Sequence, residues 1–422
     1  MSITGIKGMN DILPGEVETW QFMETTARRV FKAYGFSEIR VPVVEKTELF
    51  KRSIGETTDI VEKEMYTFND RSDNSLTLRP EGTASVMRAY TEHKLYSLDS
   101  ISKLYYLGPM FRYERPQKGR YRQFHQIGVE AIGISDPKID AQILAMLTHF
   151  FAEAEIPDVS LQINSLGCPT CRPVYREKLI AALESQLDHL CEDCRRRFHT
   201  NPLRVIDCKV PGCQAATQNA PAIIDHLCGD CGDHFNAVNN HLKNLEIPFT
   251  VNPRMVRGLD YYTRTTFEMV TNSLGSQNAV AAGGRYDGLI REIGGPDQPG
   301  IGFAMGLERL VLLKGIKSIA PSRPALFIAA LGQEAGDWGF TLAAKLQRLG
   351  ITAEIDYVGK SLKSQMRRAD KLQARYVLIV GDDEIRSGTA QLKDMDAGTQ
   401  SEVKLDQIET NLPIRLGEID IC

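Results

Sequence analysis

Two neighbouring stretches of the chain carry side chains that could bind a small charged molecule. The first is RGLDYYTRTTFE, from Arg257 to Glu268, and the second is AAGGRYDGL, from Ala281 to Leu289. Both have the composition of strands, and together they supply guanidinium, phenol and carboxylate groups and a glycine pair. Cations suit phosphate, whereas phenols and acids suit an ammonium group. We therefore expect a binding site for a small zwitterion beside a phosphorylated group.

A second candidate is the segment from residue 106 to 130, which the pattern predicts to be a strand, a basic loop and another strand. Arg112 lies on the first strand, and Gln126 and Glu130 share one face of the second because four residues is an even step. The loop cations are Arg115, Lys118, Arg120 and Arg122. Rigid guanidinium groups suit phosphate, whereas mobile cations suit the end of a nucleic acid. Taken alone, the loop could equally be a solvated turn.

Two groups of glycines lie near these segments. Gly283 and Gly284 would let the backbone approach a ligand closely, although a glycine pair often does no more than turn a strand. Gly300, Gly302 and Gly306 are spaced G-x-G-x-x-x-G, which is not the dinucleotide-binding fingerprint and follows no βαβ unit. Neither group identifies a ligand alone.

Cysteines are concentrated in one polar segment, residues 168–241, which holds eight of the nine. They comprise the C-x-x-C pairs Cys168 and Cys171, Cys191 and Cys194, and Cys228 and Cys231, together with Cys208 and Cys213. Such pairs are typical of tetrahedral zinc, and the expected ligand set is Cys191, Cys194, Cys228 and Cys231. The alternative, which we favour, is that cysteines simply fill the core of a small helical insertion. Cys168 and Cys171 are expected to be unliganded in either case.

The elements that position these residues can be predicted from periodicity. Helical spacing marks residues 16–34, and an extended run at 36–44 contains Pro42, which favours an edge strand or subunit interface. Further strands are expected at residues 65–68, 75–78, 102–113 and 124–134. Few helices separate them, so the pattern predicts an antiparallel sheet and not a doubly wound parallel one.

The rest of the chain changes character twice. A helix is expected at residues 137–155, then the helical, cysteine-rich insertion at 168–241, and then strands from 249 to 282. Residues 300–313 predict a strand that runs into a helix. After a linker at residues 321–324, strands at 325–330, 352–356, 376–380 and 389–393 alternate with helices at 337–349 and 362–372. We predict an α+β protein with one domain at residues 1–320 and an α/β domain at 321–422.

Composition narrows the class of protein. Of 422 residues, 42% are hydrophobic and 25% charged, which is ordinary for a globular chain of two or three domains. The net charge of −4 gives no overall basic field, so any nucleic-acid contact depends on local patches. No run is long and apolar enough for a secretory signal or membrane span, and we expect a cytoplasmic protein without a membrane partner.

The motifs together resemble one enzyme family. The helix at residues 16–34 and the strand near Pro42 resemble the first motif of class II aminoacyl-tRNA synthetases, which forms a homodimer interface. The hairpin at Arg112 resembles the second motif, and GIGFAMGLERL, with Arg309, the third. RGLDYY and AAGGRYDGL are similar to the two histidine-specific signatures, and the chain is identified as a member of the bacterial histidyl-tRNA synthetase family. This implies an antiparallel catalytic domain with a helical insertion and a C-terminal anticodon-binding domain.

The resemblance implies a reaction. Histidine would be activated with ATP and Mg²⁺ to histidyl-adenylate and transferred to the 3′ end of tRNA(His), with release of AMP and pyrophosphate. Charge then develops on the phosphorus and on pyrophosphate, and it needs electrostatic stabilisation. By similarity, Arg112 would hold the α-phosphate and the substrate carboxylate, and Arg309 the γ-phosphate. Arg257 would approach the α-phosphate from the other side, where other class II enzymes place a metal ion.

The resemblance also implies two sets of binding residues. Glu81, Thr83 and Gln126 would accept the ammonium group, while Glu130 and Tyr262 would satisfy the two imidazole nitrogens. The full histidine set is Glu81, Gly82, Thr83, Arg112, Gln126, Glu130, Arg257, Tyr261, Tyr262, Gly283 and Gly284. The ATP set is Arg112, Glu114, Arg120, Gly306 and Arg309.

The basic helix SLKSQMRRADK, residues 361–371, lies in the domain that resembles the anticodon-binding domain. Its cations Lys363, Arg367 and Arg368 fall within two turns and could contact tRNA phosphates, although a merely solvated face is nearly as good an interpretation. Further tRNA contacts are expected at Arg115, Lys118 and Arg122.

Two other classes of protein share part of this pattern. One is the synthetase-like regulatory subunit of ATP phosphoribosyltransferase, but such relatives lack the anticodon-binding domain and usually blur the arginine of the third motif. Here Arg309 is present, as are Arg257 and Glu130. The other is a zinc-stabilised nucleic-acid-binding protein without activity, which would explain the cysteines but not the signatures.

Overall fold

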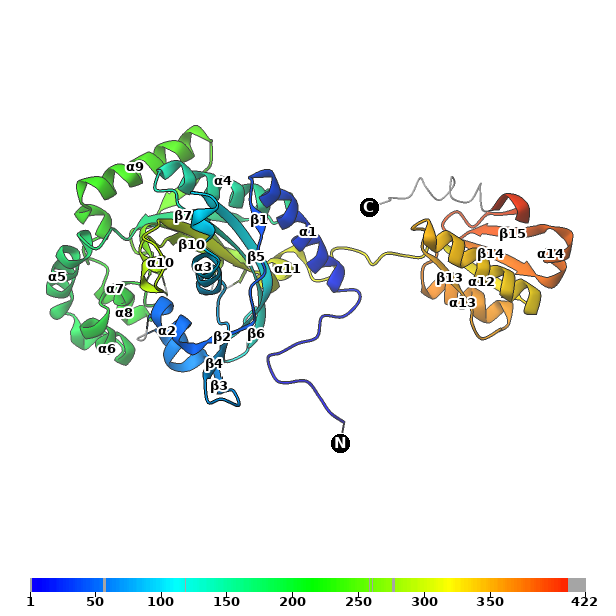
Figure 1. Cartoon of the computed structure of the whole chain (residues 1–422), viewed down its shortest axis with the longest axis horizontal. Coiled ribbons are helices and arrows are strands. Elements are labelled where there is room, and N and C mark those ends of the chain that lie inside the picture. Colours follow the sequence, from blue (N-terminus) through cyan, green and yellow to red (C-terminus); the bar gives the residue numbers. More distant parts are fainter. Residues whose placement is uncertain are drawn as a thin grey trace. The chain divides into compact units, whose positions relative to one another are not determined.

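The computed structural model describes residues 2–55, 58–117, 119–257, 259, 261–274 and 278–408 (Figure 1). The chain divides into two compact units, Met1–Ile319 and Ala320–Cys422, and each is described by itself. In the described residues, no helix combines the length and the apolar character that crossing a membrane requires.

The first unit is built on an eight-stranded sheet in the order β1-β5-β6-β11-β10-β9-β7-β8. Its strands are β1 Ser37–Glu38, β5 Ser102–Phe111, β6 Gln123–Ile132, β7 Val159–Ser165, β8 Phe249–Val251, β9 Thr263–Thr271, β10 Ala279–Arg285 and β11 Gly300–Gly306. All pairs from β5 to β7 are antiparallel, and only the edge strands β1 and β8 pair in parallel. The predicted antiparallel sheet is confirmed.

The extended run predicted at residues 36–44 is only partly a strand. Its first part is the two-residue edge strand β1, and Pro42, which has no N–H to donate, lies outside every strand. The chain then enters a separate three-stranded sheet in the order β2-β4-β3. These strands are β2 Val44–Lys46, β3 Tyr66–Asn69 and β4 Ser75–Leu78, with α2 Thr47–Ile54 and a π-helical turn Ile60–Glu64 between β2 and β3.

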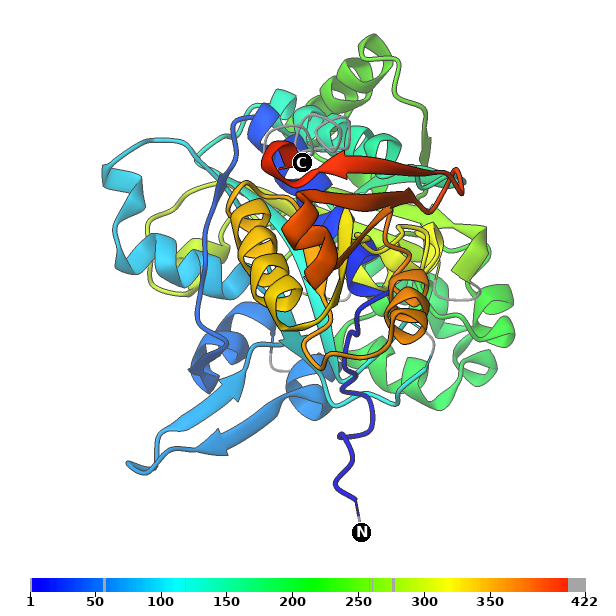
Figure 2. The same cartoon turned by 90° about the vertical axis from the view of Figure 1, so that its right-hand side faces the viewer.

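Helices cover the large sheet on one face, as the views in Figures 1 and 2 show. They are α1 Val17–Ala33, α4 Pro137–Glu153, α9 Gly229–Asn244 and α11 Leu307–Lys314. Their apolar side chains share one core with the strands, in which Phe31, Phe150 and Phe303 are in ring contact. Since α9 contributes Val238 and Leu242 to this core, the end of the expected insertion belongs to the main body.

Side chains along β6 point alternately to the two faces of the large sheet. Ile127 and Val129 belong to the core under the helices, so Gln126 and Glu130 point to the opposite face. That face carries α3 Thr83–Glu92 and a buried tyrosine cluster. Its tyrosines are Tyr90, Tyr106, Tyr261, Tyr262 and Tyr286. The sheet therefore presents its polar residues to a separate, aromatic compartment.

A buried ion pair secures β10 beneath this compartment. The Arg285 guanidinium, which is fully buried, donates to the Asp140 carboxylate of α4 at 2.7 and 3.0 Å, and His234 of α9 lies 3.1 Å from the same carboxylate. Burial alone would raise the pKa of Asp140, but the His234 hydrogen bond and the Arg285 charge lower it below its ordinary value. The pair therefore stays charged and joins two helices to the strand.

The insertion is a small helical body with its own core. Its helices are α5 Cys171–Glu184, α6 Glu192–Thr200, α7 Leu203–Ile206 and α8 Pro211–Ala216, and α9 follows. Tyr175, Leu179 and Phe198 are among the buried residues that hold it together. Short helical turns complete the unit at Leu95–Ser97, Leu187–His189, Ile223–His226 and Asn272–Leu274, with α10 at Leu289–Glu292.

The second unit is a five-stranded sheet in the order β13-β12-β14-β15-β16, coloured gold to red in Figure 2. Its elements are β12 Leu326–Leu331, α12 Gln333–Arg348, β13 Ala353–Ile355, α13 Leu362–Lys371, β14 Tyr376–Gly381, α14 Asp382–Ser387, β15 Thr389–Asp394 and β16 Gln400–Lys404. Helix α12 packs against Ile328 on one face and α13 against Phe327 on the other. The predicted α/β architecture is confirmed, with α14 and β16 as unexpected additions.

Candidate active site

A cavity in the first unit opens on the aromatic face of the sheet. Strands β6, β10 and β11 supply its floor, and α3, the β5–β6 hairpin and residues 257, 259, 261 and 262 supply its walls. Predicted site residues that line it are Glu81, Thr83, Arg112, Glu114, Arg120, Gln126, Arg257, Tyr261, Tyr262, Gly306 and Arg309. Segments far apart in the sequence thus converge on one site.

One end of the cavity lies at the start of α3. The Glu81 carboxylate accepts the backbone N–H groups of Thr83 and Ala84 at 2.6 and 2.9 Å. Burial raises the pKa of Glu81 in spite of these hydrogen bonds. Beside it, Gln126 has a buried Oε1 with no hydrogen-bond partner in the part of the chain that the structure describes. This end therefore offers acceptors to a cationic group.

Arg257 also lines the cavity. Its guanidinium forms an ion pair with Glu268 on β9 and lies 5.6 Å from the centre of the Tyr262 ring. Burial works against its charge, but Glu268 and the two tyrosines outweigh that effect and raise its pKa. Its Nε is buried and has no acceptor among the described residues. The side chain is thus fixed, charged, and able to donate to a ligand.

The other end of the cavity is strongly cationic. Arg309 on α11 donates to the carbonyl oxygens of Ala279 and, at 3.3 Å, Gly119. Burial lowers its pKa, and the positive charges of Arg120 and Arg112 lower it further. Arg112 links the two ends of the cavity, because it donates to the Pro80 carbonyl oxygen, next to Glu81, at 2.9 Å and lies 5.2 Å from the Phe124 ring, while its charge also acts on Arg309. An anion bound here would relieve the repulsion between these guanidinium groups.

Glu130 lies behind the cavity wall and is completely buried. Its carboxyl group accepts hydrogen bonds from the hydroxyl groups of Thr83, at 2.7 Å, and Tyr286. Burial raises the pKa of Glu130 to about 8, although these two hydrogen bonds lower it. A Cβ at Gly302 would lie 2.1 Å from this carboxyl group, so this glycine of the G-x-G-x-x-x-G run makes room for it.

The raised pKa of Glu130 predicts how stability depends on pH. Between its ordinary pKa of 4.5 and about 8, the folded protein keeps a proton that the unfolded chain has released, so stability is highest below this window and falls as pH rises through it. Glu130→Gln removes this loss of folding stability, which amounts to about 1.4 kcal/mol for each unit by which folding raises the pKa. We expect the Tm difference, variant minus wild type, to increase between pH 5 and pH 8.5 in thermal denaturation. A difference that is the same at both pH values would contradict the assignment.

The glycines of the predicted histidine set lie next to the cavity residues and not among them. A Cβ at Gly283 would lie 2.1 Å from the Gly302 carbonyl oxygen, and one at Gly82 would lie 2.2 Å from the Tyr106 ring. Gly284 similarly makes room for β9 backbone and for the ring of Tyr262. These close contacts with neighbouring strands and tyrosines explain the glycines, and contact with histidine stays a prediction.

Two cavity residues were missed by sequence reasoning. Tyr286 follows the glycine pair in AAGGRYDGL, and only the fold shows that its hydroxyl reaches Glu130. Glu308 precedes Arg309 and accepts the backbone N–H of His125 at 2.8 Å. Both residues lie inside motifs that had been identified from the sequence, AAGGRYDGL and GIGFAMGLERL. This position was the signal that could have identified them as site residues.

Comparisons with known proteins agree with this geometry. The model of the family described as histidyl-tRNA synthetase matches residues 8–310. The chain belongs to the histidyl-tRNA synthetase family. A model described as an anticodon binding domain matches residues 326–413 of this synthetase.

Individual relatives extend over nearly the whole synthetase. A histidine–tRNA ligase of Syntrophotalea carbinolica is 68% identical and one of Geobacter metallireducens is 67% identical, covering 98% and 96% of this chain and 98% of each relative. Among solved structures, the apo histidyl-tRNA synthetase of S. aureus is 37% identical, with a TM-score of 0.83 over 97% of this chain and 99% of that one.

The candidate tRNA-binding residues of the synthetase lie at several surfaces. Lys363, Arg367 and Arg368 are exposed on α13, whose buried side is formed by Gln365 and Ala369. In the β5–β6 hairpin, Arg115 is exposed, Arg122 lies 4.2 Å from the Tyr113 ring, and Lys118 lies outside the described residues.

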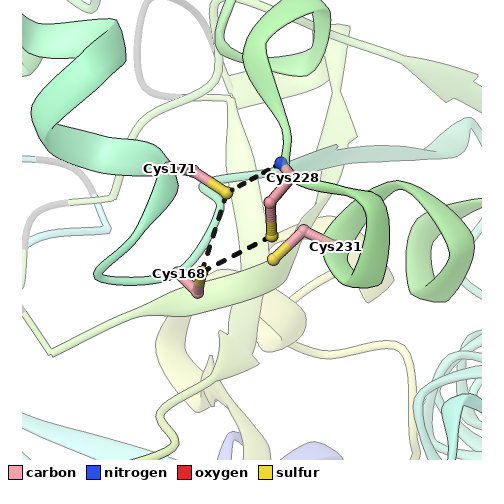
Figure 3. A group of neighbouring side chains, drawn as sticks. All are labelled: Cys168, Cys171, Cys228 and Cys231. Atoms are coloured by element: carbon pink, nitrogen blue, oxygen red, sulfur yellow. Dashed lines mark hydrogen bonds between the residues drawn. The ribbon is translucent and has the colours of Figure 1, made fainter.

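The cysteines of the synthetase do not form the predicted set. Cys228 and Cys231 meet Cys168 and Cys171 (Figure 3), whereas Cys191 and Cys194 meet Cys208 and Cys213. The expectation of one site made from Cys191, Cys194, Cys228 and Cys231, with Cys168 and Cys171 apart, is therefore wrong. Spacing identified the pairs, but the fold brings together the first pair and the last.

Proposed function

We propose that this chain is a histidine–tRNA ligase, which activates L-histidine with ATP and transfers it to the 3′ end of tRNA(His). The observation that carries this proposal is one cavity with carboxylate and amide acceptors at one end, of which Gln126 Oε1 is unsatisfied among the described residues, and with clustered guanidinium groups toward the other. A zwitterion and a triphosphate need this combination. Family membership agrees with it.

Histidine is proposed to bind at the α3 end. Its ammonium group would contact Glu81, Thr83 and the free Oε1 of Gln126. Its imidazole would be bound by Tyr262 and by Glu130, which would exchange a hydroxyl partner for a ring nitrogen. A neutral carboxyl group can donate and accept, as the two nitrogens of a neutral imidazole require. Analogues without either nitrogen would leave buried polar groups unpaired.

ATP is proposed to bind at the cationic end as its Mg²⁺ complex. The histidine carboxylate attacks the α-phosphorus, the bond to the bridging oxygen breaks, and pyrophosphate leaves with the electron pair. Arg112 and Arg257 both line the cavity, and they would stabilise the charge that develops on the α-phosphate. Arg309, with Arg120, would hold the γ-phosphate and the departing pyrophosphate.

The tRNA half of the reaction is proposed to involve both units. Residues 1–320 would form the catalytic domain, and residues 321–422, which contain the anticodon-binding match, would contact the tRNA. The segment of α1 and β1 resembles the family's dimer motif, which supports a homodimer. The enzyme is also proposed to act in the cytoplasm. The hydroxyl of the terminal adenosine would then attack the adenylate carbonyl, and AMP would leave.

Charging of tRNA(His) with labelled histidine tests the ligase function. We expect the purified protein to form acid-precipitable histidyl-tRNA only when ATP is present, and to leave a non-cognate tRNA uncharged. A folded protein that charges neither tRNA would overturn the proposal.

Exchange of Arg367 and Arg368 for Ala should weaken tRNA binding selectively. Both side chains are exposed on α13, and loss of two phosphate contacts should raise the KM for tRNA several-fold and reduce the slope of log KM against log salt by about 1.5 to 2. Adenylate formation should not change. Arg386→Ala, an exposed arginine of α14 in the same unit, is the matched control. A loss of adenylate formation would contradict the assignment.

A further inference from the structure

We propose that this chain carries two structural zinc ions, each bound by four cysteine thiolates. The first site consists of Cys168, Cys171, Cys228 and Cys231, and the second of Cys191, Cys194, Cys208 and Cys213. Together they use all eight cysteines of the described residues. In each group, all four sulfur atoms lie within 4.8 Å of one another.

The spacing of the sulfur atoms fits tetrahedral zinc. A zinc–sulfur bond of about 2.3 Å places the four sulfur atoms of a tetrahedron about 3.8 Å apart. The Sγ atoms of Cys168 lie 3.7 Å from Cys171 and 3.8 Å from Cys228, and those of Cys191 and Cys208 lie 4.0 Å apart. A disulfide would require about 2.05 Å. Figure 3 shows the first group converging on one point from two segments.

Backbone groups around both sites favour thiolates. Helices α5, α6 and α9 each begin within one residue of a C-x-x-C cysteine, which places the positive ends of their dipoles beside sulfur. Cys228 N–H donates to the Sγ of Cys171, and Cys191 N–H to the Sγ of Cys213, both at 3.1 Å. Such hydrogen bonds are expected in the shell around a thiolate site, because four thiolates and one zinc ion carry a net negative charge.

A purely apolar role for the cysteines explains the arrangement less well. Cysteines that fill a core should be buried, yet Cys168, Cys191, Cys208 and Cys228 are half-exposed, two in each group. Packing of an apolar core also does not require four sulfur atoms to converge on one point, and here this arrangement occurs in two places. Thiolates in a tetrahedral set select zinc or iron, and zinc needs no redox partner.

The two sites would fasten different parts of the fold. The first joins segments 60 residues apart, at the two ends of the insertion, and therefore closes the insertion where it meets the main body. Gly167 lets the chain pass close to Cys171, since a Cβ there would lie 2.7 Å from the Cys171 Cβ. The second site joins α6 to α8 inside the insertion core.

The first site also lies next to the segment that forms the cavity wall. Arg172, directly after Cys171, donates to the carbonyl oxygens of Leu166, at 3.3 Å, and Tyr262. Arg204 of α7 donates to the Arg257 carbonyl at 2.9 Å. Metal at the first site would therefore hold the backbone of the proposed histidine site in place, a consequence that rests on the proposed function, whereas metal binding itself does not.

Metal content of the purified full-length protein tests the proposal. We expect two equivalents of zinc per chain by plasma mass spectrometry and by native mass spectrometry. Cys171→Ser with Cys231→Ser should leave one equivalent, and Cys194→Ser with Cys213→Ser should also leave one. Cys422→Ser, which changes the ninth cysteine, should retain two. Release of zinc by a thiol reagent should precede loss of folded structure, because metal binding is coupled to folding.

Cobalt supplies a readout that does not depend on folding of the variants. Wild-type protein produced with Co²⁺ should show sulfur-to-cobalt charge-transfer bands and the intense visible bands of tetrahedral cobalt, at two equivalents per chain. Wild-type protein with fewer than two metal equivalents, and with freely reactive thiols besides that of Cys422, would overturn the proposal. Stoichiometric iron in place of zinc would overturn the assignment of the metal.

Discussion

Arg257→Ala should lower the rate constant of histidine-dependent pyrophosphate exchange about 10²- to 10³-fold. The side chain is charged, is held by Glu268, and keeps a buried Nε that has no acceptor among the described residues. An interaction made mainly with the charge that develops on the α-phosphate affects the rate more than ground-state binding. The KM for histidine should therefore change much less than the rate constant. Exchange kinetics at saturating ATP measure both quantities.

Two further variants separate catalysis from folding in this experiment. Arg257→Lys keeps the charge but loses the planar fork, and it should recover only part of the activity. Arg291→Ala removes an exposed arginine whose partner is the exposed Asp297, and it should behave as wild type. A loss for Arg257→Ala that appears only in the KM for histidine would assign the residue to substrate binding instead.

Arg309→Ala should weaken use of ATP, with a loss in kcat/KM for ATP of about 10- to 100-fold. Its guanidinium is anchored by backbone carbonyl groups at Gly119 and Ala279 and repelled by Arg112 and Arg120. We expect a bound triphosphate to neutralise these charges together. The KM for histidine, which we propose to bind at the α3 end of the cavity, should be nearly unchanged. Exchange measured over a range of ATP concentrations gives this result.

Arg309→Lys and a double variant make this prediction specific. Lysine retains a point charge and should recover part of the ATP affinity. Combining Arg309→Ala with Arg257→Ala should give less than additive losses if both arginines stabilise one transition state, because residues that act as a unit are not additive. An effect on the KM for histidine as large as that on ATP would contradict the division of the cavity into two ends.

Much of the fold was predictable because long strands and helices carry strong periodicity. The antiparallel core and the α/β architecture of the second unit follow from such segments. Strands β1 and β2 were not predicted as they occur, because β1 has two residues and β2 has three, too few to show alternation. Their assignment to two different sheets depends on pairing with β5 and β4, whose partner residues lie at least thirty positions away in sequence.

The site was predictable where chemistry determines residue type. Arg112, Arg257 and Arg309 were chosen from separate motifs, and all three line one cavity. The reason for the glycines was not predictable, because sequence cannot distinguish backbone that approaches a ligand from backbone that approaches a neighbouring strand. The prediction of how the cysteines group was wrong for a similar reason. Grouping among C-x-x-C pairs depends on the path of the chain, which places the first pair beside the last.

The second unit argues against the alternative that this chain is a regulatory subunit of ATP phosphoribosyltransferase. Such relatives lack an anticodon-binding domain, whereas this chain matches one over residues 326–413. Arg309 is present and lines the cavity, as an ATP-using enzyme requires. The inactive zinc-protein alternative accounts for neither feature, and the two cysteine groups are compatible with a ligase.

Exchange of labelled pyrophosphate into ATP by the wild-type protein, measured with each of the twenty amino acids, tests the central claim most directly. Behind the cavity wall, the buried carboxyl group of Glu130 accepts a hydrogen bond from Tyr286, and burial raises its pKa to about 8. We therefore expect the site to select the imidazole side chain. We predict exchange with histidine and a preference over other amino acids of about 10⁴-fold or more. Absence of exchange with histidine in folded protein, or comparable exchange with another amino acid, would contradict the account.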